Sequence, residues 1–206
     1  MHIQPLFAET DIRALHGLIR AYPLATLTTQ TSHGLDANLL PLELIEAGTC
    51  GLLRGHVARH HPLYADAPDD SALAVFQGPN AYISPRWYVN GQRSGRLAPS
   101  WNYVAVQARG RLRFIDDAAW VLAHLTSLME RQEAHREQPW SMADTSAPFA
   151  ADAAQALVGF EIDILALSGK LFLSQQRTEA DRRSVIQHLE REASGTARDL
   201  AALIVP

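Results

Sequence analysis

Hydrophobic and polar residues alternate over much of the first 115 residues, in short runs that turn-forming residues separate. Alternation with a period of two places successive side chains on opposite faces of a β-strand. The runs predict strands at residues 24–29, 35–45, 50–54, 72–77, 81–84 and 101–115. Pro41 interrupts the second run, as is typical of an edge strand or a bulge. Near the C-terminus, residues 158–167 and 170–174 predict a hairpin that turns at Ser168 and Gly169.

Helical periodicity is restricted to shorter segments that flank these runs. Thr10 is the expected N-cap of a first helix, which Pro23 ends, and Asp116 and Asp117 are expected to cap another. Further helices are expected at 62–66, 179–192 and 196–204, and a loop at 90–99. Because strands dominate the first 115 residues, the pattern favours a mainly β protein with peripheral helices. We expect a closed or nearly closed antiparallel barrel, since closure removes the sheet edges.

The composition is that of a globular protein. With 206 residues, 47% of them hydrophobic and 19% charged, the chain suits one large domain or one domain with a helical appendage. Cys50 is the only cysteine, which excludes an intrachain disulfide and a CxxC zinc site, and we expect a buried, inert thiol. The first ten residues lack the features of a signal peptide, and the apolar runs are too short to cross a membrane. We therefore expect a cytoplasmic protein.

The charge is unevenly distributed along the chain. The formal net charge is −4, yet residues 71–115 contain no acidic residue and carry the arginines Arg86, Arg93, Arg96, Arg109, Arg111 and Arg113. Alternation places the last three on one face of the expected 101–115 strand. Arginine pairs bidentately with phosphate, and the tryptophans and tyrosines of this region offer flat apolar surfaces, so the region suits a phosphorylated aromatic small molecule. A solvated basic face beside ordinary core aromatics is the alternative.

A second basic segment, residues 53–62, combines two arginines with three histidines. His56, His60 and His61 form an HxxxHH pattern, but no cysteine or matched carboxylate completes a set of metal ligands, so no metal site is predicted. A haem-binding barrel, with one of these histidines as axial ligand, is kept as an alternative.

Several short motifs resemble those of the PaiB family, in the same order and over roughly the whole chain. They include Leu53-Arg54-Gly55-His56-Val57-Ala58-Arg59, Phe76-Gln77-Gly78-Pro79, Trp101-Asn102-Tyr103 and Leu173-Ser174-Gln175. The resemblance implies an FMN-binding split antiparallel β-barrel, related in fold to pyridoxamine-phosphate oxidases, and a homodimer with the flavin at the subunit interface. It also implies a link to negative transcriptional regulation of protease synthesis and sporulation. On this basis we expect a split-barrel domain at 1–175 and a C-terminal helical extension at 176–206.

The resemblance further implies which residues contact FMN. They are Arg54, Gly55, His56, Val57, Ala58, Arg59, Gln77, Ser84, Trp101, Asn102, Tyr103, Lys170, Ser174, Gln175 and Arg177. Arg54 and Arg59 are the phosphate candidates, joined by backbone amides where the chain is expected to turn around Gly55. His56 is expected at the ribityl chain or the flavin edge, with a hydrogen-bonded structural histidine as the alternative.

The remaining candidates have polar or aromatic roles in the expected pocket. Gln77 and Ser84, expected at the ends of short strands, suit the polar edge of the isoalloxazine ring. Trp101, Asn102 and Tyr103 are expected to line the pocket, with a core role as the alternative for the two aromatics. A second polar cluster comprises Lys170, Ser174, Gln175 and Arg177. We expect it to complete the site across the interface, and a role limited to contacts of the C-terminal tail is the alternative. Gln176 and Ser100 depart from the family, which usually has Asn and Thr there.

Three functions are compatible with these residues. The first is a flavin-dependent redox or sensing role linked to negative transcriptional regulation, in which the flavin carries the chemistry and no catalytic side chain is identified. The second is a transcriptional regulator that binds DNA directly and has no enzymatic activity. The net charge of −4 and the absence of a helix-turn-helix signature make direct DNA binding doubtful. The third is a barrel of the same fold that binds haem, with a histidine as axial ligand, or that binds no cofactor.

Overall fold

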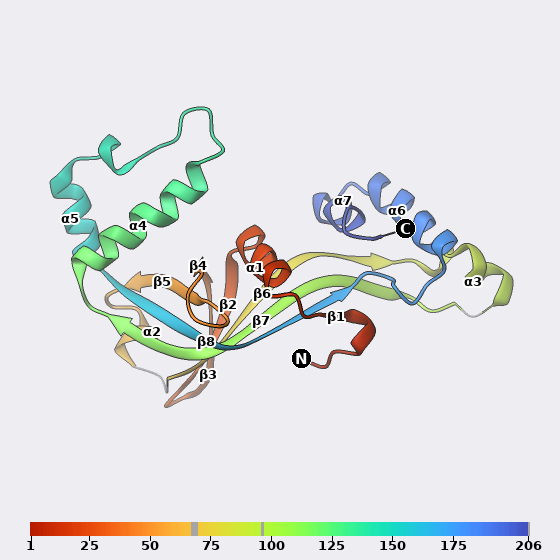
Figure 1. The fold of residues 1–206 in the computed structure, drawn as a ribbon, viewed down its shortest axis with the longest axis horizontal. Coiled ribbons are helices and arrows are strands. Elements are labelled where there is room, and N and C mark those ends of the chain that lie inside the picture. The colour runs from red at the N-terminus through yellow and green to blue at the C-terminus, as the bar shows by residue number, and fades with distance from the viewer. Residues whose placement is uncertain (67–69, 96, 206) are drawn as a thin grey trace. The chain divides into compact units, whose positions relative to one another are not determined.

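The computed structural model describes residues 1–66, 70–95 and 97–205, with the side chain of Arg93 left out. Within these residues, eight strands form one mostly antiparallel sheet in the order β3-β2-β6-β7-β8-β5-β4, and β1 pairs with β8 (Figure 1). No hydrogen-bonded ladder joins β3 to β4 in this described part, so hydrogen bonds do not close the sheet. The prediction of a mainly β protein with peripheral helices is confirmed.

The strands are β1 (Ala8–Glu9), β2 (Leu24–Thr31), β3 (Gly34–Pro41), β4 (Glu43–Ile45), β5 (Leu52–Ala58), β6 (Ser71–Ile83), β7 (Ser100–Ile115) and β8 (Leu157–Phe172). The α-helices are α1 (Ile12–Ala21), α2 (Pro62–Ala65), α3 (Val89–Ser94), α4 (Ala118–Glu133), α5 (Ala147–Gln155), α6 (Glu179–Arg191) and α7 (Gly195–Ala201). Short 3-10 helices are η1 (Pro5–Phe7), η2 (Pro85–Trp87) and η3 (Met142–Asp144). No helix in the described part of the chain has the length and hydrophobicity that spanning a bilayer requires.

The chain divides into two compact units. The first comprises Met1–Tyr22, Val75–Gln107 and Ser168–Pro206, and the second comprises Pro23–Ala74 and Ala108–Leu167. Strands β6, β7 and β8 therefore contribute residues to both units. The C-terminal segment that we expected to be a separate extension, 176–206, falls within the first unit.

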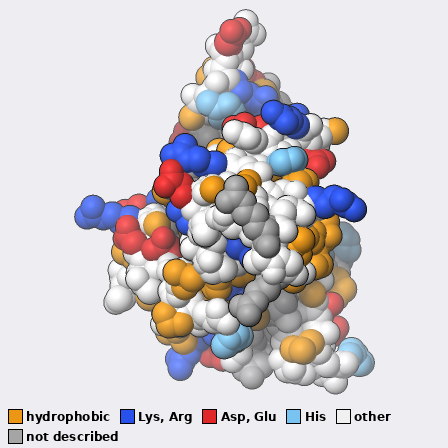
Figure 2. Space-filling view, turned by 90° about the vertical axis from the view of Figure 1, so that its right-hand side faces the viewer, with side chains coloured by type: hydrophobic (Ala, Val, Ile, Leu, Met, Phe, Trp, Pro, Cys, Tyr) orange, Lys and Arg blue, Asp and Glu red, His pale blue; other side chains and the backbone are white. Residues whose placement is uncertain are grey.

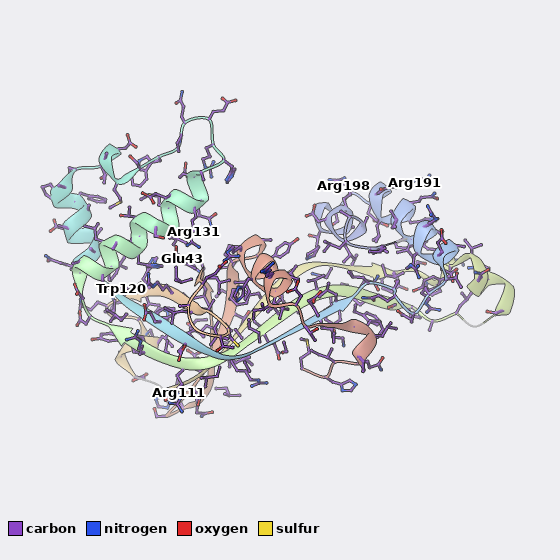
Figure 3. All side chains as sticks on the ribbon, in the orientation of Figure 1. Glu43, Arg111, Trp120, Arg131, Arg191 and Arg198 are labelled. Atoms are coloured by element: carbon purple, nitrogen blue, oxygen red, sulfur yellow. The ribbon has the colours of Figure 1, made fainter. Side chains whose placement is uncertain are left out.

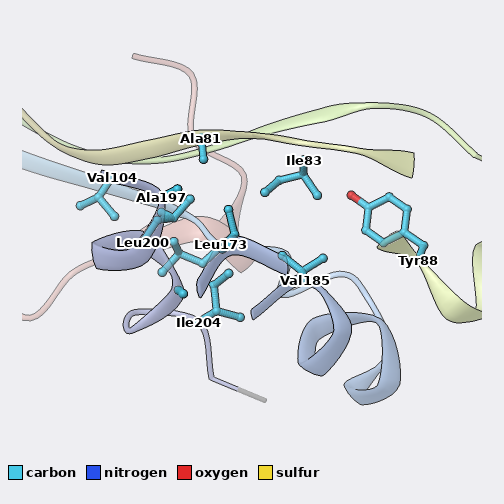
Figure 4. Packing of buried hydrophobic residues seen from close by; sticks show 11 residues of the cluster. Ala81, Ile83, Tyr88, Val104, Leu173, Val185, Ala197, Leu200 and Ile204 are labelled. Carbon is cyan, nitrogen blue, oxygen red and sulfur yellow. The ribbon is translucent and has the colours of Figure 1, made fainter. Parts of the chain in front are cut away.

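The first unit is built around a cluster of buried apolar side chains (Figure 4). Its members are Ala81, Ile83, Tyr88, Val104, Leu173, Val185, Leu189, Ala197, Leu200, Ala201 and Ile204. Val185 and Leu189 are four residues apart on α6, so they lie on one face of that helix. The C-terminal helices thus bury an apolar face in the same cluster to which β6 and β7 contribute.

Helix α4 belongs to the second unit and packs against β8. Asp117 caps it, as expected, because its side chain accepts hydrogen bonds from the backbone N–H groups of Ala119 and Trp120. The ring of Trp120 lies directly over Gly159 of β8, where a Cβ atom would be 2.2 Å from the ring. Glycine at this position is therefore what allows the helix to lie close to the strand.

Glycines that we expected at turns or strand ends lie inside continuous strands. β5 runs through Gly55, β6 runs through Gly78 and Pro79, and β8 runs through Gly169, so the predicted turn, break and hairpin are wrong. Each glycine instead allows a close approach by another residue. A Cβ atom at Gly55 would lie 2.3 Å from the Phe160 ring, and the Gly169 position faces Leu15 and Glu9, which is part of the short strand β1.

Other local expectations need correction. The first helix is capped by Asp11 rather than by Thr10, because the Asp11 carboxylate accepts from the N–H of Arg13. The expected loop at 90–99 contains α3, which ends at Gly95 in the left-handed conformation. Cys50 is half-buried rather than buried. Arg96 lies outside the described residues.

The end of β3 agrees with the interpretation of Pro41. β3 is the last strand of the sheet order, and Pro41 is its final residue. The expected strand 35–45 does not continue, because residues after Leu42 form β4, which pairs with β5 instead of β2. A proline at an edge costs no hydrogen bond of an interior ladder.

Replacement of Gly110 by alanine tests the close packing of β7. A Cβ atom there would lie 2.2 Å from the backbone oxygen of Asp163, which cannot move aside as a side chain can. We expect Gly110→Ala to lower the free energy of unfolding by about 1–3 kcal/mol in urea denaturation. Gly17→Ala is the matched control, because Gly17 is exposed in α1 with no atom near its Cβ position. That variant should gain about 0.5–1 kcal/mol from helix propensity, and equal effects of the two substitutions would contradict the packing argument.

Candidate functional site

The predicted FMN-binding residues form two sets, one in each unit. The set in the second unit is Arg54, Gly55, His56, Val57, Ala58 and Arg59. The set in the first unit is Gln77, Ser84, Trp101, Asn102, Tyr103, Lys170, Ser174, Gln175 and Arg177.

A cavity in the first unit brings together three of the predicted residues. Its volume is about 470 Å³, and it is lined by Met1, Val75, Gln77, Gly78, Asn80, Trp101, Tyr103, Val104 and Ala105. Gln77 reaches it from within β6, not from a strand end as expected. Trp101 and Tyr103 are two residues apart on β7 and therefore share a face of the strand. The indole N–H of Trp101 donates to Asn80 Oδ1 at 3.0 Å, which fixes both side chains at the cavity wall.

The two aromatic residues that line this cavity contact further aromatic rings and one ammonium group outside it. Trp101 is 56% exposed and packs edge-to-face with Tyr82, which is 48% exposed, at a centroid distance of 6.2 Å. The Lys170 Nζ atom lies 5.3 Å from the centre of the Tyr103 ring and 5.7 Å from that of Phe172. Its ammonium donates to the backbone oxygen of His2 at 3.3 Å. The cavity wall thus combines apolar surface with amides, and the Lys170 ammonium contacts one of its aromatic rings.

Asn102 does not line the cavity. It alternates with Trp101 and Tyr103 along β7, so its side chain points to the opposite face, where it is fully buried. Its Nδ2 donates to the hydroxyl of Ser174 at 2.9 Å, while its Oδ1 has no partner within the described residues. Ser174 has a positive φ of 67° in the segment that follows β8. The pair is brought together as expected, but it supports a tight backbone bend.

Three other predicted residues have local contacts. Ser84 caps η2 by accepting from the N–H of Arg86 at 3.3 Å. Gln175 accepts from the N–H of Leu173 at 2.8 Å and donates to the oxygen of Leu171. It also lines a second cavity of about 350 Å³ together with Leu171, Leu173, Arg182, Leu203 and Val205. The guanidinium of Arg177 stacks on the ring of Tyr88 at 4.1 Å.

In the second unit, Arg59 is held by several acceptors. Its two terminal nitrogens donate to the carboxylate of Asp116 at 2.8 and 2.7 Å, and its Nε donates to the oxygen of Gln155 at 3.0 Å. One terminal nitrogen also donates to the oxygen of Leu157 at 3.3 Å. The hydrogen bonds from Arg59 lower the pKa of Asp116. A phosphate group at Arg59 would therefore exchange with a carboxylate, and the role of Arg59 as a phosphate ligand stays a prediction.

Arg54 lies opposite a buried carboxylate. In the β5–β8 ladder it pairs with Glu161, and its Nε donates to Glu161 Oε1 at 3.0 Å. Arg113 donates to the other oxygen of the same carboxylate, which is 3% exposed. The guanidinium of Arg54 also lies 5.5 Å from the centre of the Trp120 ring. The arginines on the exposed face of β7 are thus partly paired, since Arg111 also approaches Asp70 at 3.7 Å.

His56 belongs to a chain of hydrogen bonds that sequence reasoning missed. Its Nδ1 is 3.2 Å from His124 Nε2, and His124 Nδ1 is 3.1 Å from Glu43 Oε2. Glu43 also accepts from the hydroxyl of Ser127 at 2.6 Å and pairs with Arg131 Nε at 3.1 Å. The side chains of Glu43 and His124 are each 1% exposed. Figure 3 shows the labelled Glu43 on β4 next to Arg131 of α4, with Trp120 on the same helix.

Burial keeps both histidines neutral. Desolvation and, to a smaller extent, the neighbouring His124 together lower the pKa of His56 to about 4. Desolvation also lowers the pKa of His124, although its hydrogen bond to Glu43 opposes this effect. Near pH 7 each imidazole therefore carries a single N–H.

The sequence does contain one indication that the α4 residues of this hydrogen-bond chain act together, namely their helical spacing. His124, Ser127 and Arg131 lie at positions i, i+3 and i+7 of α4, which places them on one face of the helix. Nothing in the sequence pairs that face with Glu43, because 81 residues separate Glu43 from His124. In the described part of the chain, no group of three or more histidine, cysteine or acidic side chains is placed to hold a metal ion.

Sequence comparison finds relatives along the whole chain. Residues 1–166 match the family model described as "Putative FMN-binding domain". The chain is 29% identical over 206 residues to the protease synthase and sporulation protein PAI 2 of Bacillus subtilis, covering 99% of this chain and 96% of that protein. It is 27% identical over 241 residues to an uncharacterized protein of Emericella nidulans, with the same shares covered.

Two solved structures resemble this one. The flavocytochrome Anf3 from Azotobacter vinelandii gives a TM-score of 0.57 at 14% identity, over 82% of this chain and 72% of that one. The FAD and haem binding protein from Mycobacterium smegmatis gives 0.59 at 16% identity, over 80% and 73%. At these identities the likeness concerns the fold alone, and it agrees with the predicted split barrel.

A change of stability with pH tests the neutral state of His56. Unfolded His56 takes up a proton below about pH 6.5, whereas the folded residue stays neutral down to about pH 4. The free energy of unfolding should therefore fall as the pH decreases through this window. We expect His56→Gln to reduce that fall by on the order of 2 kcal/mol, allowing for partial solvent screening. His60→Gln, at an exposed residue outside the hydrogen-bond chain, should keep the wild-type profile, and identical profiles for all three proteins would contradict the assignment.

Proposed function

Because this chain belongs to the family of FMN-binding domains that its first 166 residues match, we propose that it binds FMN and acts in a flavin-dependent redox or sensing process. The observation that carries the proposal is the cavity lined by Gln77, Trp101 and Tyr103. The resemblance to the family implies that these residues contact the cofactor, and the fold brings them together in one concave site.

The cavity suits a flavin ring by size and by the chemistry of its walls. Its volume of about 470 Å³ falls among those of small-molecule sites, which are mostly apolar with a few polar groups. The isoalloxazine ring is flat and aromatic, and its edge carries both hydrogen-bond donors and acceptors. Aromatic side chains match its faces, and the amides of Gln77 and Asn80 can both donate and accept.

Each lining residue then has a distinct role. Trp101 and Tyr103 orient the ring and exclude water from it, and Gln77 binds its polar edge. When bound, FMN supplies the electron or hydride transfer, while the protein supplies orientation and electrostatics. Lys170 beside Tyr103 is the phosphate candidate of the first unit, and Arg54 and Arg59 are those of the second.

We also propose a homodimer with the flavin at the subunit interface. Trp101 and Tyr82 support this, because they form an exposed aromatic pair next to the cavity. Large exposed apolar side chains at the rim of a site are typical of surfaces that a partner or ligand covers. A second subunit would remove both rings from water and enclose the flavin.

Regulation through the flavin fits the surface better than direct contact with DNA. The relative from Bacillus subtilis is named for protease synthesis and sporulation, which supports a regulatory link. Acidic and basic side chains are interspersed on the face that Figure 2 shows. Arg191 lies on α6, which also carries Glu179 and Asp181, and Arg198 lies on α7, which also carries Asp199 (Figure 3 labels both arginines). DNA binding requires a concentrated basic surface, so we propose that the flavin state acts through a metabolite or a partner protein.

Flavin absorption of the purified protein tests the cofactor. After addition of FMN and desalting, we expect the two flavin bands to elute with the protein. Trp101→Leu should weaken FMN binding about tenfold, since a stacked aromatic contact contributes about 1 kcal/mol or more. Trp140→Leu is the control, because Trp140 is also exposed but lines neither of the two cavities described above.

Other outcomes of this measurement would redirect the assignment. A colourless protein that ignores FMN would refute the cofactor proposal. A Soret band would favour the haem-binding alternative, and salt-dependent retention on duplex DNA would favour the direct regulator.

Sedimentation equilibrium tests the oligomeric state. We expect a mass twice that of the chain for the wild type. Tyr82→Glu places a charge in the proposed interface and should shift the population toward monomer, whereas Phe149→Glu, at an exposed residue of the second unit, should not. A monomeric wild-type protein that binds FMN would refute the interface site while leaving the cofactor proposal intact.

A further inference from the structure

We propose that Nε2 of His56 is a fixed hydrogen-bond acceptor for a hydroxyl group of a phosphorylated polyol, and that His124 and Glu43 are the positioning residues that fix it. The inference rests on the proposed function in one respect, because the ribityl phosphate tail of FMN is a phosphorylated polyol. A free sugar phosphate has the same chemistry and is the other source of such a ligand.

The direction of each hydrogen bond in the series from Arg131 to His56 follows from Arg131, because a guanidinium group can donate but cannot accept. Arg131 has only donors, so Glu43 accepts from it, and the Ser127 hydroxyl donates to the same oxygen. The other carboxylate oxygen, 3.1 Å from His124 Nδ1, then accepts from an N–H on that nitrogen. A neutral imidazole has one N–H, so His124 Nε2 carries a lone pair.

The same reasoning passes from His124 to His56. The lone pair on His124 Nε2 requires a donor, and His56 Nδ1 at 3.2 Å supplies it. His56 Nε2 is then left with a lone pair. In the described part of the structure no hydrogen bond uses that nitrogen, and it is not among the buried polar atoms that lack a partner, so it is open to a ligand. The low pKa of His56 is consistent with an acceptor that stays neutral.

The neighbouring residues define which ligand fits. Arg54 precedes His56 by two residues on β5, so the two side chains lie on the same face, about 7 Å apart along the strand. Glu161 engages Arg54 through Nε, which leaves its terminal nitrogens for phosphate. Trp120 contacts Arg54 and His124, because the Arg54 guanidinium lies over its ring and the His124 ring stacks on it at a centroid distance of 5.3 Å. A phosphate at Arg54 and a hydroxyl at His56 together match a phosphorylated polyol.

This arrangement also makes the site selective for donors. An acceptor such as a carbonyl or a carboxylate gains nothing at His56, because two lone pairs would face each other. Without Glu43 the tautomers of both histidines are free to exchange, and His56 then presents an N–H as readily as a lone pair.

Nitrogen NMR of the histidine rings tests the tautomer directly in the wild-type protein. At pH 7 we expect His56 to carry its proton on Nδ1 and a lone pair on Nε2. Addition of FMN or of ribose 5-phosphate should shift the Nε2 resonance in the direction of a new hydrogen bond, whereas sulfate, which has no hydroxyl, should not. A response to ribose 5-phosphate alone would identify free sugar phosphates as the ligand, and a response to FMN alone would identify the flavin tail. A proton on Nε2 in the wild type, or no response to either compound, would overturn the proposal.

Affinity measurements with a matched control separate this inference from the cofactor assignment. We expect Glu43→Gln and His124→Phe to weaken binding of FMN about tenfold and to leave binding of lumiflavin, which lacks the ribityl phosphate, unchanged. His60→Gln should change neither. Unchanged FMN affinity in both Glu43→Gln and His124→Phe would overturn the proposal even if FMN binds well. Failure of lumiflavin and FMN to bind the wild type would instead refute the flavin assignment, and the response to ribose 5-phosphate would still decide the role of His56.

Discussion

The alternation of side chains along β6, β7 and β8 is the constraint on which the rest of the structure depends. Each of these strands contributes residues to both compact units, so one residue of slippage would reverse the faces in both. The alternation directs Trp101 and Tyr103 to the cavity and Asn102 to the core. Farther along β7 it exposes Arg109, while the residues between the arginines face inward.

Two buried carboxylates determine the partners of several basic side chains. Glu43 and Glu161 are each 3% exposed, and a carboxylate removed from water is tolerated only when it is paired and hydrogen-bonded. Glu161 forms ion pairs with Arg54 and Arg113, and Glu43 pairs with Arg131 and accepts a hydrogen bond from His124. Basic side chains that look available in the sequence are therefore partly committed in the fold. The number of arginines in the sequence therefore overestimates the number of guanidinium groups that are free of a carboxylate partner.

The sequence predicted the elements that depend on local chemistry. The strand over 101–115, the cap at Asp117 and the two C-terminal helices follow from alternation, capping and helical spacing, and all are present. The errors concern glycines, such as Gly55 and Gly169, that were interpreted as turns. Their reason for being glycine lies in residues distant in the chain, the Phe160 ring and the Leu15 side chain, which local patterns do not reveal. The hydrogen bonds from Glu43 to His56 were missed for the same reason, because they join β4, α4 and β5.

The contacts of Arg59 give ligand binding a mechanical consequence. Its guanidinium ties the end of β5 to the last turn of α5, to the first residue of β8 and, through Asp116, to the segment that starts α4. An anion that takes this guanidinium from Asp116 would release the start of the helix that carries His124. Anion binding at Arg59 and anchoring of α4 are thus competing events, and thermodynamic reciprocity requires each to weaken the other by the same factor. The anchoring of α4 therefore lowers the affinity of Arg59 for any phosphate.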